Sequence, residues 1–234
     1  MKKTTILTII IIPLIFLSAC TQKADVMEKE PIKEKPMEVD IITEEKKPQT
    51  PAPTPKQETK TNTIVMVVAP KDFKDVEFFT PLEIFEAAGY EVLVASTIAG
   101  EVFGLDGGTY MADIELSDID PNNLDAIVIS GGGGVLDHLW NDPILMDKIN
   151  AVANENKIVS ALCLSPGLLA QAGVLDSVSA TVCERPPAMK AFEDGNVNYT
   201  ADSVTTDGNI VTGNGPKASA DFANAVLKAI DVNQ

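Results

Sequence analysis

Short apolar runs alternate with helical patterns beyond residue 62, and this alternation restricts the fold more than any other feature of the chain. The runs are rich in β-branched residues and read Ile64–Ala69, Glu91–Ser96, Ala126–Ile129 and Lys157–Leu162. Nearly continuous hydrophobic strands separated by helices form parallel sheets whose two faces are both covered. The sequence therefore predicts an α/β three-layer sandwich with a mainly parallel, flavodoxin-like sheet and right-handed crossovers.

Helices and turns are expected between and after these strands. Residues 101–113 contain three glycines and predict a hairpin. The spacing of apolar residues predicts helices over 81–88, 141–154, 165–172 and 218–230, and two further strands over 203–206 and 210–212. Gly89 is expected to end the first of these helices.

The N-terminus has the pattern of a targeting segment. Lys2 and Lys3 precede an apolar run from Ile6 to Leu17. A run of about 12 residues is too short for a membrane-spanning helix, which needs about 20, but it suits a signal peptide. The stretch Leu17-Ser18-Ala19-Cys20 resembles a bacterial lipobox. Residues 1–19 are thus predicted to be a lipoprotein signal peptide and Cys20 the lipidated N-terminus; a plain secretory signal is the alternative.

Two further segments follow the signal. Residues 20–62 contain the predicted lipidated cysteine and a stretch rich in proline, lysine and glutamate without aromatic residues. Such a composition buries too little apolar surface to offset the entropy of ordering, so we expect a disordered tether. Residues 63–234 are the predicted domain. The expected location is the extracytoplasmic side of the cell membrane, with the membrane contacted through the lipid on Cys20.

The charge balance argues against several classes of partner. The chain has 18 basic and 34 acidic residues and a formal net charge of −16. Beyond residue 62, 8 basic residues stand against 25 acidic ones. This excess of negative charge repels phosphate backbones and anionic lipids, so no nucleic acid is expected as a partner. His138 is the only histidine, which excludes a multi-histidine metal site; neither a metal nor a cofactor is expected.

Three segments with unusual chemistry follow predicted strands. Glu77, the glycine run 131–134 and Cys163 each come after an apolar run. Ligands of parallel sheets bind at the carboxyl ends of the strands. Cys163 lies between a strand and a helix that begins near Pro166, the position of a nucleophile elbow, where the helix N-terminus would lower the thiol pKa. The alternative from this position alone is that Cys163 is a buried cysteine that packs as a small hydrophobic residue.

Four stretches in order resemble one family. Residues 159–170 (VSALCLSPGLLA) are similar to the nucleophile segment of the ThiJ/PfpI family, in the class I glutamine amidotransferase-like superfamily. Residues 75–83 (DVEFFTPLE) resemble its acidic segment and 127–132 (IVISGG) its strand–glycine turn. Residues 213–216 (GNGP) resemble the segment before its last helix. The resemblance covers about residues 63–232.

The resemblance implies a set of site residues. Cys163 would be the nucleophile, and Glu77 would lie beside it with its carboxyl hydrogen-bonded to the thiol. Next to a thiolate, that carboxyl would be driven toward its protonated form. The backbone N–H groups of Gly132 and Leu164 would bind an anion. Family members commonly dimerise, so a homodimer is also implied.

The chain departs from the family at two positions. Leu164 stands where protease-like members carry a histidine after the nucleophile, and Cys183 stands where many relatives have another. His138 lies in no family motif and is expected at the surface. Without a neighbouring imidazole as general base, peptidase activity is disfavoured.

Three functions remain open at this point. One is glyoxalase- or deglycase-like hydrolysis of a small reactive carbonyl compound, in which Cys163 attacks the carbon and Glu77 transfers the proton. A second is redox sensing, in which an oxidant converts Cys163 to a sulfenic acid and Cys183 completes a disulfide. The third is a binding module without activity, whose cysteine is unreactive.

Overall fold

The computed structural model describes residues 62–233. The predicted signal peptide, the lipidation site at Cys20 and the predicted tether lie outside the described residues. Within 62–233, no helix is both long and apolar enough to span a bilayer.

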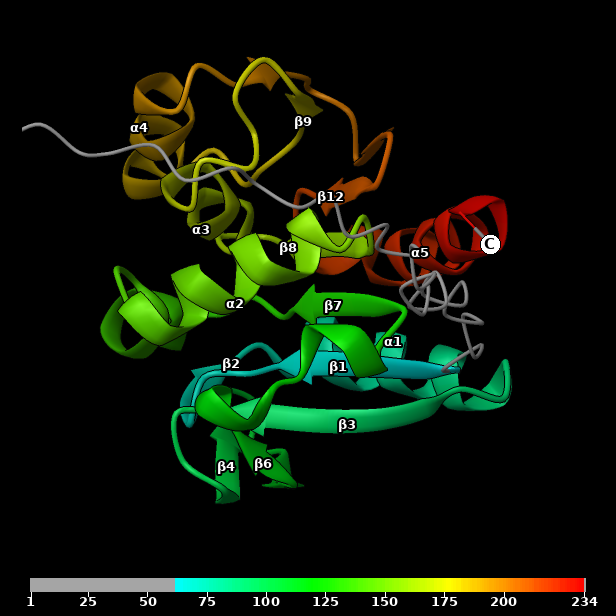
Figure 1. Cartoon of the computed structure of the whole chain (residues 1–234). Helices are drawn as coiled ribbons and strands as arrows, with labels where there is room; N and C mark the ends of the chain where they lie inside the picture. Colours follow the sequence, from blue (N-terminus) through cyan, green and yellow to red (C-terminus); the bar gives the residue numbers. More distant parts are fainter. Residues whose placement is uncertain (1–61, 234) are drawn as a thin grey trace, which may run out of the picture. The chain divides into compact units, whose positions relative to one another are not determined.

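A seven-stranded sheet forms the centre of the domain (Figure 1). Its strand order is β11-β12-β8-β7-β1-β3-β6, and only the β11–β12 pair is antiparallel. The strands are β1 (Thr63–Val67), β3 (Glu91–Ser96), β6 (Ile114–Glu115), β7 (Ala126–Ile129), β8 (Ile158–Leu162), β11 (Val204–Asp207) and β12 (Ile210–Gly213). Along β3-β1-β7-β8-β12, the order is second-first-third-fourth-fifth, which is the flavodoxin-like arrangement. The predicted fold class is confirmed.

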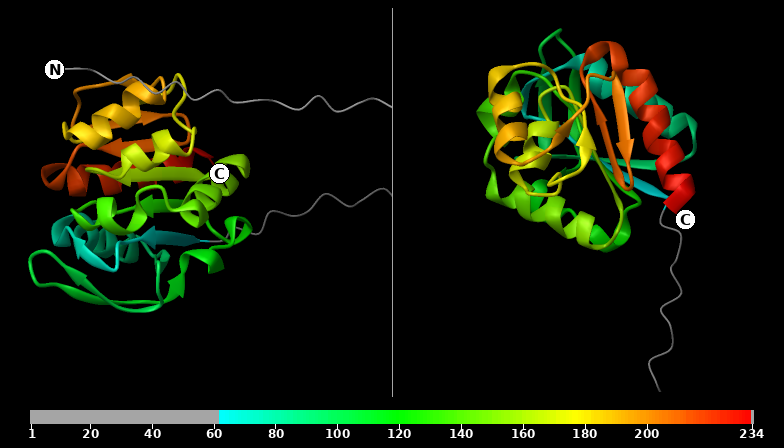
Figure 2. Two further views of the ribbon diagram at one scale, coloured as in Figure 1. Left: turned by 90° about the vertical axis from the view of Figure 1, so that its left-hand side faces the viewer. Right: turned by 90° about the horizontal axis from the view of Figure 1, so that it is seen from above.

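Two hydrophobic cores lie on opposite faces of this sheet. In β1, Ile64 and Met66 point into one core, and Val65 and Val67 into the other, because successive strand residues face opposite sides. Helices α1 (Asp75–Ala87) and α5 (Ser219–Asn233) cover the first face. Helices α2 (Pro143–Asn154), α3 (Pro166–Gln171) and α4 (Pro186–Asp194) cover the second (Figure 2). Burial on both faces explains why the strands are hydrophobic throughout.

The first helix begins earlier than the sequence predicts. Residue 81 was the expected start, but α1 starts at Asp75 and contains Pro81 in its interior. Proline lacks the N–H that would bond to the carbonyl of Glu77, four residues back, and it is therefore commonly taken as a helix start. The correction matters for the site, because it places Glu77 in the first turn of the helix.

Three elements after residue 178 were not predicted. They are β9 (Ser179–Ala180), α4 and β10 (Asn198–Tyr199). Pro186 and Pro187 open α4, and a proline pair suggests a loop when only the sequence is read. The helix predicted from residue 141 begins at Pro143, with the Asp142 carboxylate accepting a hydrogen bond from the Leu145 N–H at 2.9 Å.

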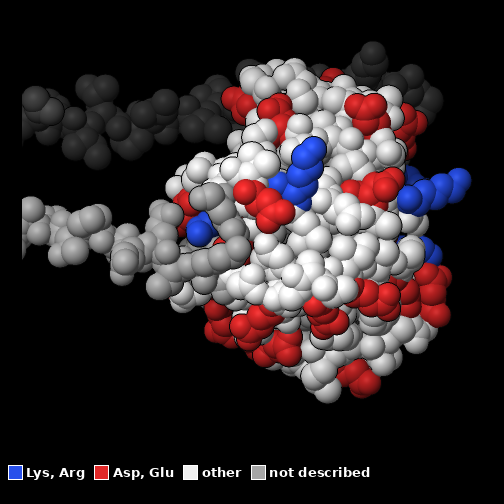
Figure 3. All heavy atoms as spheres, turned by 90° about the vertical axis from the view of Figure 1, so that its right-hand side faces the viewer, with Lys and Arg blue, Asp and Glu red and all other residues white. Residues whose placement is uncertain are grey.

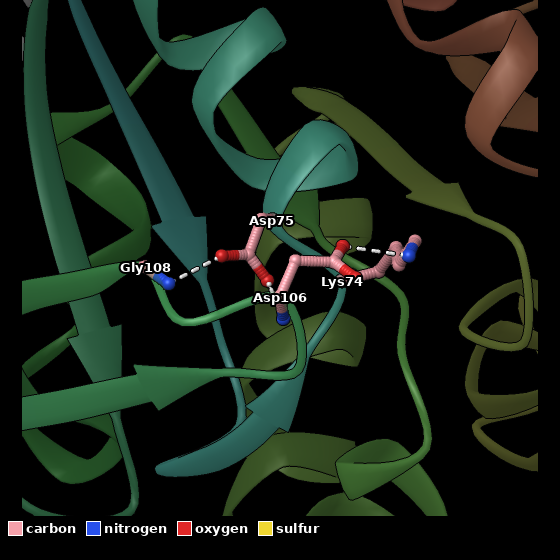
Figure 4. Close-up of polar contacts among 4 residues, drawn as sticks. All are labelled: Lys74, Asp75, Asp106 and Gly108. Atoms are coloured by element: carbon pink, nitrogen blue, oxygen red, sulfur yellow. Dashed lines mark hydrogen bonds and ion pairs between the residues drawn. The ribbon is translucent and has the colours of Figure 1, made fainter.

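The predicted hairpin is attached to the start of α1. Strands β2 (Lys71–Phe73), β4 (Gly100–Gly104) and β5 (Thr109–Ala112) form a small separate sheet. The Asp75 carboxylate accepts hydrogen bonds from the N–H groups of Asp106 at 2.8 Å and Gly108 at 2.6 Å, and Lys74 Nζ lies 2.6 Å from the Asp106 carboxylate (Figure 4). A side chain at Gly108 would overlap the Asp75 carboxylate. These contacts hold the hairpin beside the helix turn that carries Glu77.

Among the charged side chains on the face of the domain shown in Figure 3, most are acidic. Within residues 62–233, ion pairs join Lys74 to Asp106 and Lys190 to Asp194. With 25 acidic residues against 8 basic ones beyond residue 62, most carboxylates have no basic partner. The surface therefore repels anions in general.

Candidate active site

Cys163 occupies a left-handed backbone conformation between β8 and α3. Its φ is 65°, a region that non-glycine residues rarely adopt and that costs free energy unless neighbouring contacts enforce it. Two hydrogen bonds supply those contacts: the Cys163 N–H donates to the Gly213 carbonyl at 2.8 Å, and its carbonyl accepts from the Cys183 N–H at 2.9 Å. The predicted position of Cys163, at the carboxyl end of a strand and before a helix, is what the structure shows.

Glu77 lies buried against this cysteine. The residue is 1% exposed. Its two carboxyl oxygens have no hydrogen-bond partner among the described residues, and the carboxyl group lies beside the Cys163 side chain at Gly131. Burial, reinforced by the neighbouring Cys163, raises the pKa of Glu77 to about 9, against a small opposite effect of Lys74. At neutral pH Glu77 is a neutral carboxylic acid.

Gly131 makes room for the pair. A Cβ atom at this position would overlap the Glu77 carboxyl group and lie 2.5 Å from Cys163 Cβ. Gly132 and Gly134, in the same run, lie against the main chain of residues 71–74. Of the four glycines, Gly133 alone has free space around the missing Cβ. Gly131, Gly132 and Gly134 thus allow close approach of protein segments, and Gly132 and Gly133 also line the cavity at the cysteines.

Cys183 is the third member of the cluster. Its thiol is hydrogen-bonded to that of Cys163. This hydrogen bond and burial raise the pKa of Cys163, whereas the same bond lowers the pKa of Cys183 despite burial. Both shifts describe one pair that shares a proton, so the first thiolate forms readily and the second with difficulty. The lowered thiol pKa expected at this turn is therefore a property of the Cys163–Cys183 pair, and the assignment of the thiolate to Cys163 remains a prediction.

The two residues whose backbone amides are implied for anion binding both line the cavity at Cys163. The Leu164 N–H donates to the Cys163 thiol, an effect that favours its thiolate. Gly132 has a φ of 119° and lines the same cavity as the two cysteines. Both residues line the cavity into which a group attached to Cys163 would extend. Their role in anion binding remains a prediction.

A cavity of about 620 Å³ opens onto these groups. Besides the predicted residues, its lining includes Lys74, Leu105, Leu136 and Arg185. Nothing in the sequence around Lys74 pointed to it, whereas Arg185 is conspicuous as the single arginine of the chain. His138 is exposed and does not line the cavity, as expected. Within residues 62–233, no group of three or more His, Cys, Asp or Glu side chains could hold a metal ion.

The fold and the site define an α/β protein in which a cysteine between a strand and a helix faces a buried glutamic acid. A model of the DJ-1/PfpI family matches residues 62–229, and the chain belongs to this family.

Relatives match about two thirds to three quarters of the chain. An uncharacterized protein of Methanocaldococcus jannaschii is 39% identical over 178 residues, which are 76% of this chain and 87% of the relative. A deglycase of Pyrococcus abyssi is 29% identical over 152 residues, covering 65% and 90% of the two chains. The crystal structure of a ThiJ/PfpI domain protein from Brachyspira murdochii has a TM-score of 0.71 and 34% identity, and the match covers 74% of this chain and 99% of that one.

Substitution of Gly131 tests the packing of the site. Gly131→Ala would force the Glu77 carboxyl and Cys163 apart, so we expect a loss of about 1–3 kcal/mol in the free energy of unfolding. Gly133→Ala is the matched control, because a Cβ there meets nothing within 4 Å. Urea denaturation of both variants and the wild type measures the difference, and equal stability of the two variants would contradict the packing described here.

The pH dependence of stability tests the protonation of Glu77. The folded state holds a proton that the unfolded chain releases between pH 4.5 and about 9, so stability falls as pH rises through this window. Glu77→Gln removes the ionisable group, and with it this loss of stability at higher pH. Its stability relative to the wild type should increase with pH, by at most about 1.4 kcal/mol per pH unit. Urea denaturation at several pH values measures this, with the exposed Glu83→Gln on the same helix as control. Parallel curves for wild type and Glu77→Gln would refute a neutral Glu77.

Proposed function

We propose that the protein hydrolyses small reactive carbonyl compounds, with Cys163 as nucleophile and Glu77 as the group that transfers the proton. The observation that carries this proposal is a neutral carboxylic acid buried against the cysteine thiol. A buried acid with a pKa near 9 supplies a proton at neutral pH where a histidine does so in other cysteine enzymes.

The chemistry follows from the positions of the three groups. The Cys163 sulfur attacks the aldehyde carbon and forms the carbon–sulfur bond of a hemithioacetal. Glu77 donates its proton to the developing alkoxide and takes up the thiol proton in return, so no charge is left behind. The N–H groups of Leu164 and Gly132 stabilise the alkoxide while it forms. With methylglyoxal, addition of one water gives lactate: the aldehyde carbon is oxidised, the ketone carbon is reduced, and no outside oxidant is required.

The comparisons support this choice at the level of the family. Two relatives, from Pyrococcus abyssi and Thermococcus kodakarensis, are named deglycases, each at 29% identity to this chain. The apolar side chains of Leu105 and Leu136 in the cavity wall suit a small substrate from which water must be partly excluded.

Turnover of methylglyoxal tests the proposal. Cys163→Ala should reduce lactate formation to the uncatalysed rate, because the carbon–sulfur bond cannot form. Glu77→Gln should lower kcat by about 10²–10⁴-fold, since the side chain no longer exchanges a proton. Glu83→Gln, on the exposed face of α1, is the control. Undiminished lactate production by Cys163→Ala would overturn the proposal, as would a wild type without turnover.

The contact between the two thiols favours redox sensing as a second candidate. A thiolate of the pair attacks the O–O bond of a peroxide, takes one oxygen as a sulfenic acid and releases an alcohol or water. The other thiol then displaces that oxygen as water and forms the disulfide. The net change is two thiols and one peroxide giving one disulfide, one water and one alcohol, or two waters from hydrogen peroxide. The adjacent main chains of Cys163 and Cys183, joined at 2.9 Å, suit such a bond.

Peroxide treatment of the reduced protein distinguishes the second candidate. We expect a loss of two hydrogens in the intact mass, with a disulfide-linked pair of peptides containing Cys163 and Cys183, reversed by dithiothreitol. In Cys183→Ser, the same treatment should instead add oxygen atoms to Cys163, because the resolving thiol is missing. Two thiols that remain open to alkylation after peroxide treatment would end this candidate.

The cellular position is proposed from the N-terminal sequence. Cleavage before Cys20 and acylation of its thiol would anchor the domain to the extracytoplasmic side of the cell membrane, and residues 21–62 would separate the domain from the bilayer. Cys20→Ala should move the protein out of the membrane fraction. A Cys20→Ala protein that still sediments with membranes would contradict lipid anchoring.

A further inference from the structure

The cavity at Cys163 has a charge opposite to that of the domain. Acidic residues outnumber basic ones by 25 to 8 beyond residue 62, yet the ionisable residues lining the cavity, apart from the two cysteines, are Lys74, Arg185 and Glu77. Glu77 is neutral at physiological pH. The lining therefore contains two positive charges and no ionised carboxylate, on a molecule whose surface otherwise repels anions.

Arg185 is the more available of the two cations. It is exposed, it immediately precedes α4, and its N–H donates to the Cys183 carbonyl at 2.7 Å. Within residues 62–233 its guanidinium group forms no hydrogen bond or ion pair, in a chain with a large excess of carboxylates. A guanidinium group presents a planar set of donors that matches a carboxylate in two-point contact. The fold thus holds an unpaired Arg185 at the cavity, beside the thiol pair.

Lys74 contributes less to the attraction of an anion. Its ammonium group is already bound to Asp106, which does not line the cavity (Figure 4). The Asp106 carboxylate partly neutralises the Lys74 ammonium group, so Lys74 attracts an anion less strongly than Arg185 does. The two cations also lie on different segments of the chain. Both segments border the same space, one from the start of α1 and the other from the start of α4.

We propose that this cavity prefers carbonyl compounds that carry a carboxylate, and that Arg185 is the residue that binds the carboxylate. The volume of about 620 Å³ is larger than methylglyoxal requires and lies within the range of about 300–1,000 Å³ for small-molecule sites. Hemithioacetals between methylglyoxal and small acidic thiols combine the reactive carbon with the negative group. The reaction of such adducts rests on the proposed function, whereas the preference for an anion does not.

Two alkylating reagents measure the preference without any turnover. Iodoacetate and iodoacetamide attack thiolates by the same displacement, with loss of iodide, and differ in one negative charge. The ratio of their rates at Cys163 and Cys183, followed by peptide mass, cancels any change in the thiolate fraction. Arg185→Gln should lower the iodoacetate-to-iodoacetamide ratio on the order of 3–10-fold, through the loss of one nearby charge.

Lys190→Gln is the matched control for this experiment. Lys190 is an exposed residue of α4, the helix that follows Arg185. Its ammonium group is paired with Asp194 at 2.8 Å, and it does not line the cavity. Its substitution should leave the ratio within about twofold of the wild type, the change expected for an exposed and already paired charge. A ratio that is the same in Arg185→Gln as in the wild type would overturn the proposal.

A matched pair of substrates separates this proposal from the hydrolase function. The hemithioacetals of methylglyoxal with N-acetylcysteine and with N-acetylcysteinamide differ in one carboxylate. Arg185→Gln should raise KM at least about fivefold for the acidic adduct and leave KM for the amide adduct unchanged. Equal changes for both adducts would contradict anion binding by Arg185. If the wild type turns over neither adduct, the hydrolase function fails, and the alkylation ratio still decides the anion preference.

Discussion

Two main-chain hydrogen bonds of Cys163 hold the site together. One joins its N–H to Gly213 at the end of β12, and the other joins its carbonyl to the N–H of Cys183. They enforce the left-handed conformation that turns the chain from β8 into α3, and they fix the segment containing Cys183 beside the turn. The contact between the two thiols follows from this arrangement of the backbone.

The position of Glu77 depends on a different set of contacts. The start of α1 is held by the Asp75 carboxylate, which binds two N–H groups of the β4–β5 hairpin. The Lys74 N–H also donates to the Gly131 carbonyl at 3.0 Å, and the missing side chain of Gly131 leaves the space where Glu77 meets Cys163. Burial then makes the carboxyl group neutral. A proton carrier therefore stands beside the thiols in a site without histidine.

Much of the fold follows from local sequence, and much of the site does not. The strands were predictable because β-branched runs buried on both faces have few alternatives, and the position of Cys163 followed from the strand before it and Pro166 after it. Pro81 concealed the true start of α1, and the proline pair at 186 and 187 concealed α4.

Long-range contacts account for the rest. Cys183 lies beside Cys163 because the segment that contains it runs past the end of β12, where its N–H bonds to the Cys163 carbonyl. No local sequence pattern predicts this path of the chain. The same holds for Lys74 and Arg185, which reach one cavity from segments far apart in the sequence. Family resemblance supplied Glu77 and the expectation of its protonated form, whereas the burial that contributes most to this effect is a property of the folded chain.

The central claim is that a neutral glutamic acid is held against the thiol pair at physiological pH. Infrared difference spectroscopy of the wild type against Glu77→Gln, with the carboxyl carbons labelled by ¹³C-glutamate, tests it directly. The account predicts a protonated carboxyl C=O band at pH 7 that shifts with the label, disappears in Glu77→Gln and converts to a carboxylate band only when the pH is raised to about 9. A carboxylate band for Glu77 at pH 7 would contradict it.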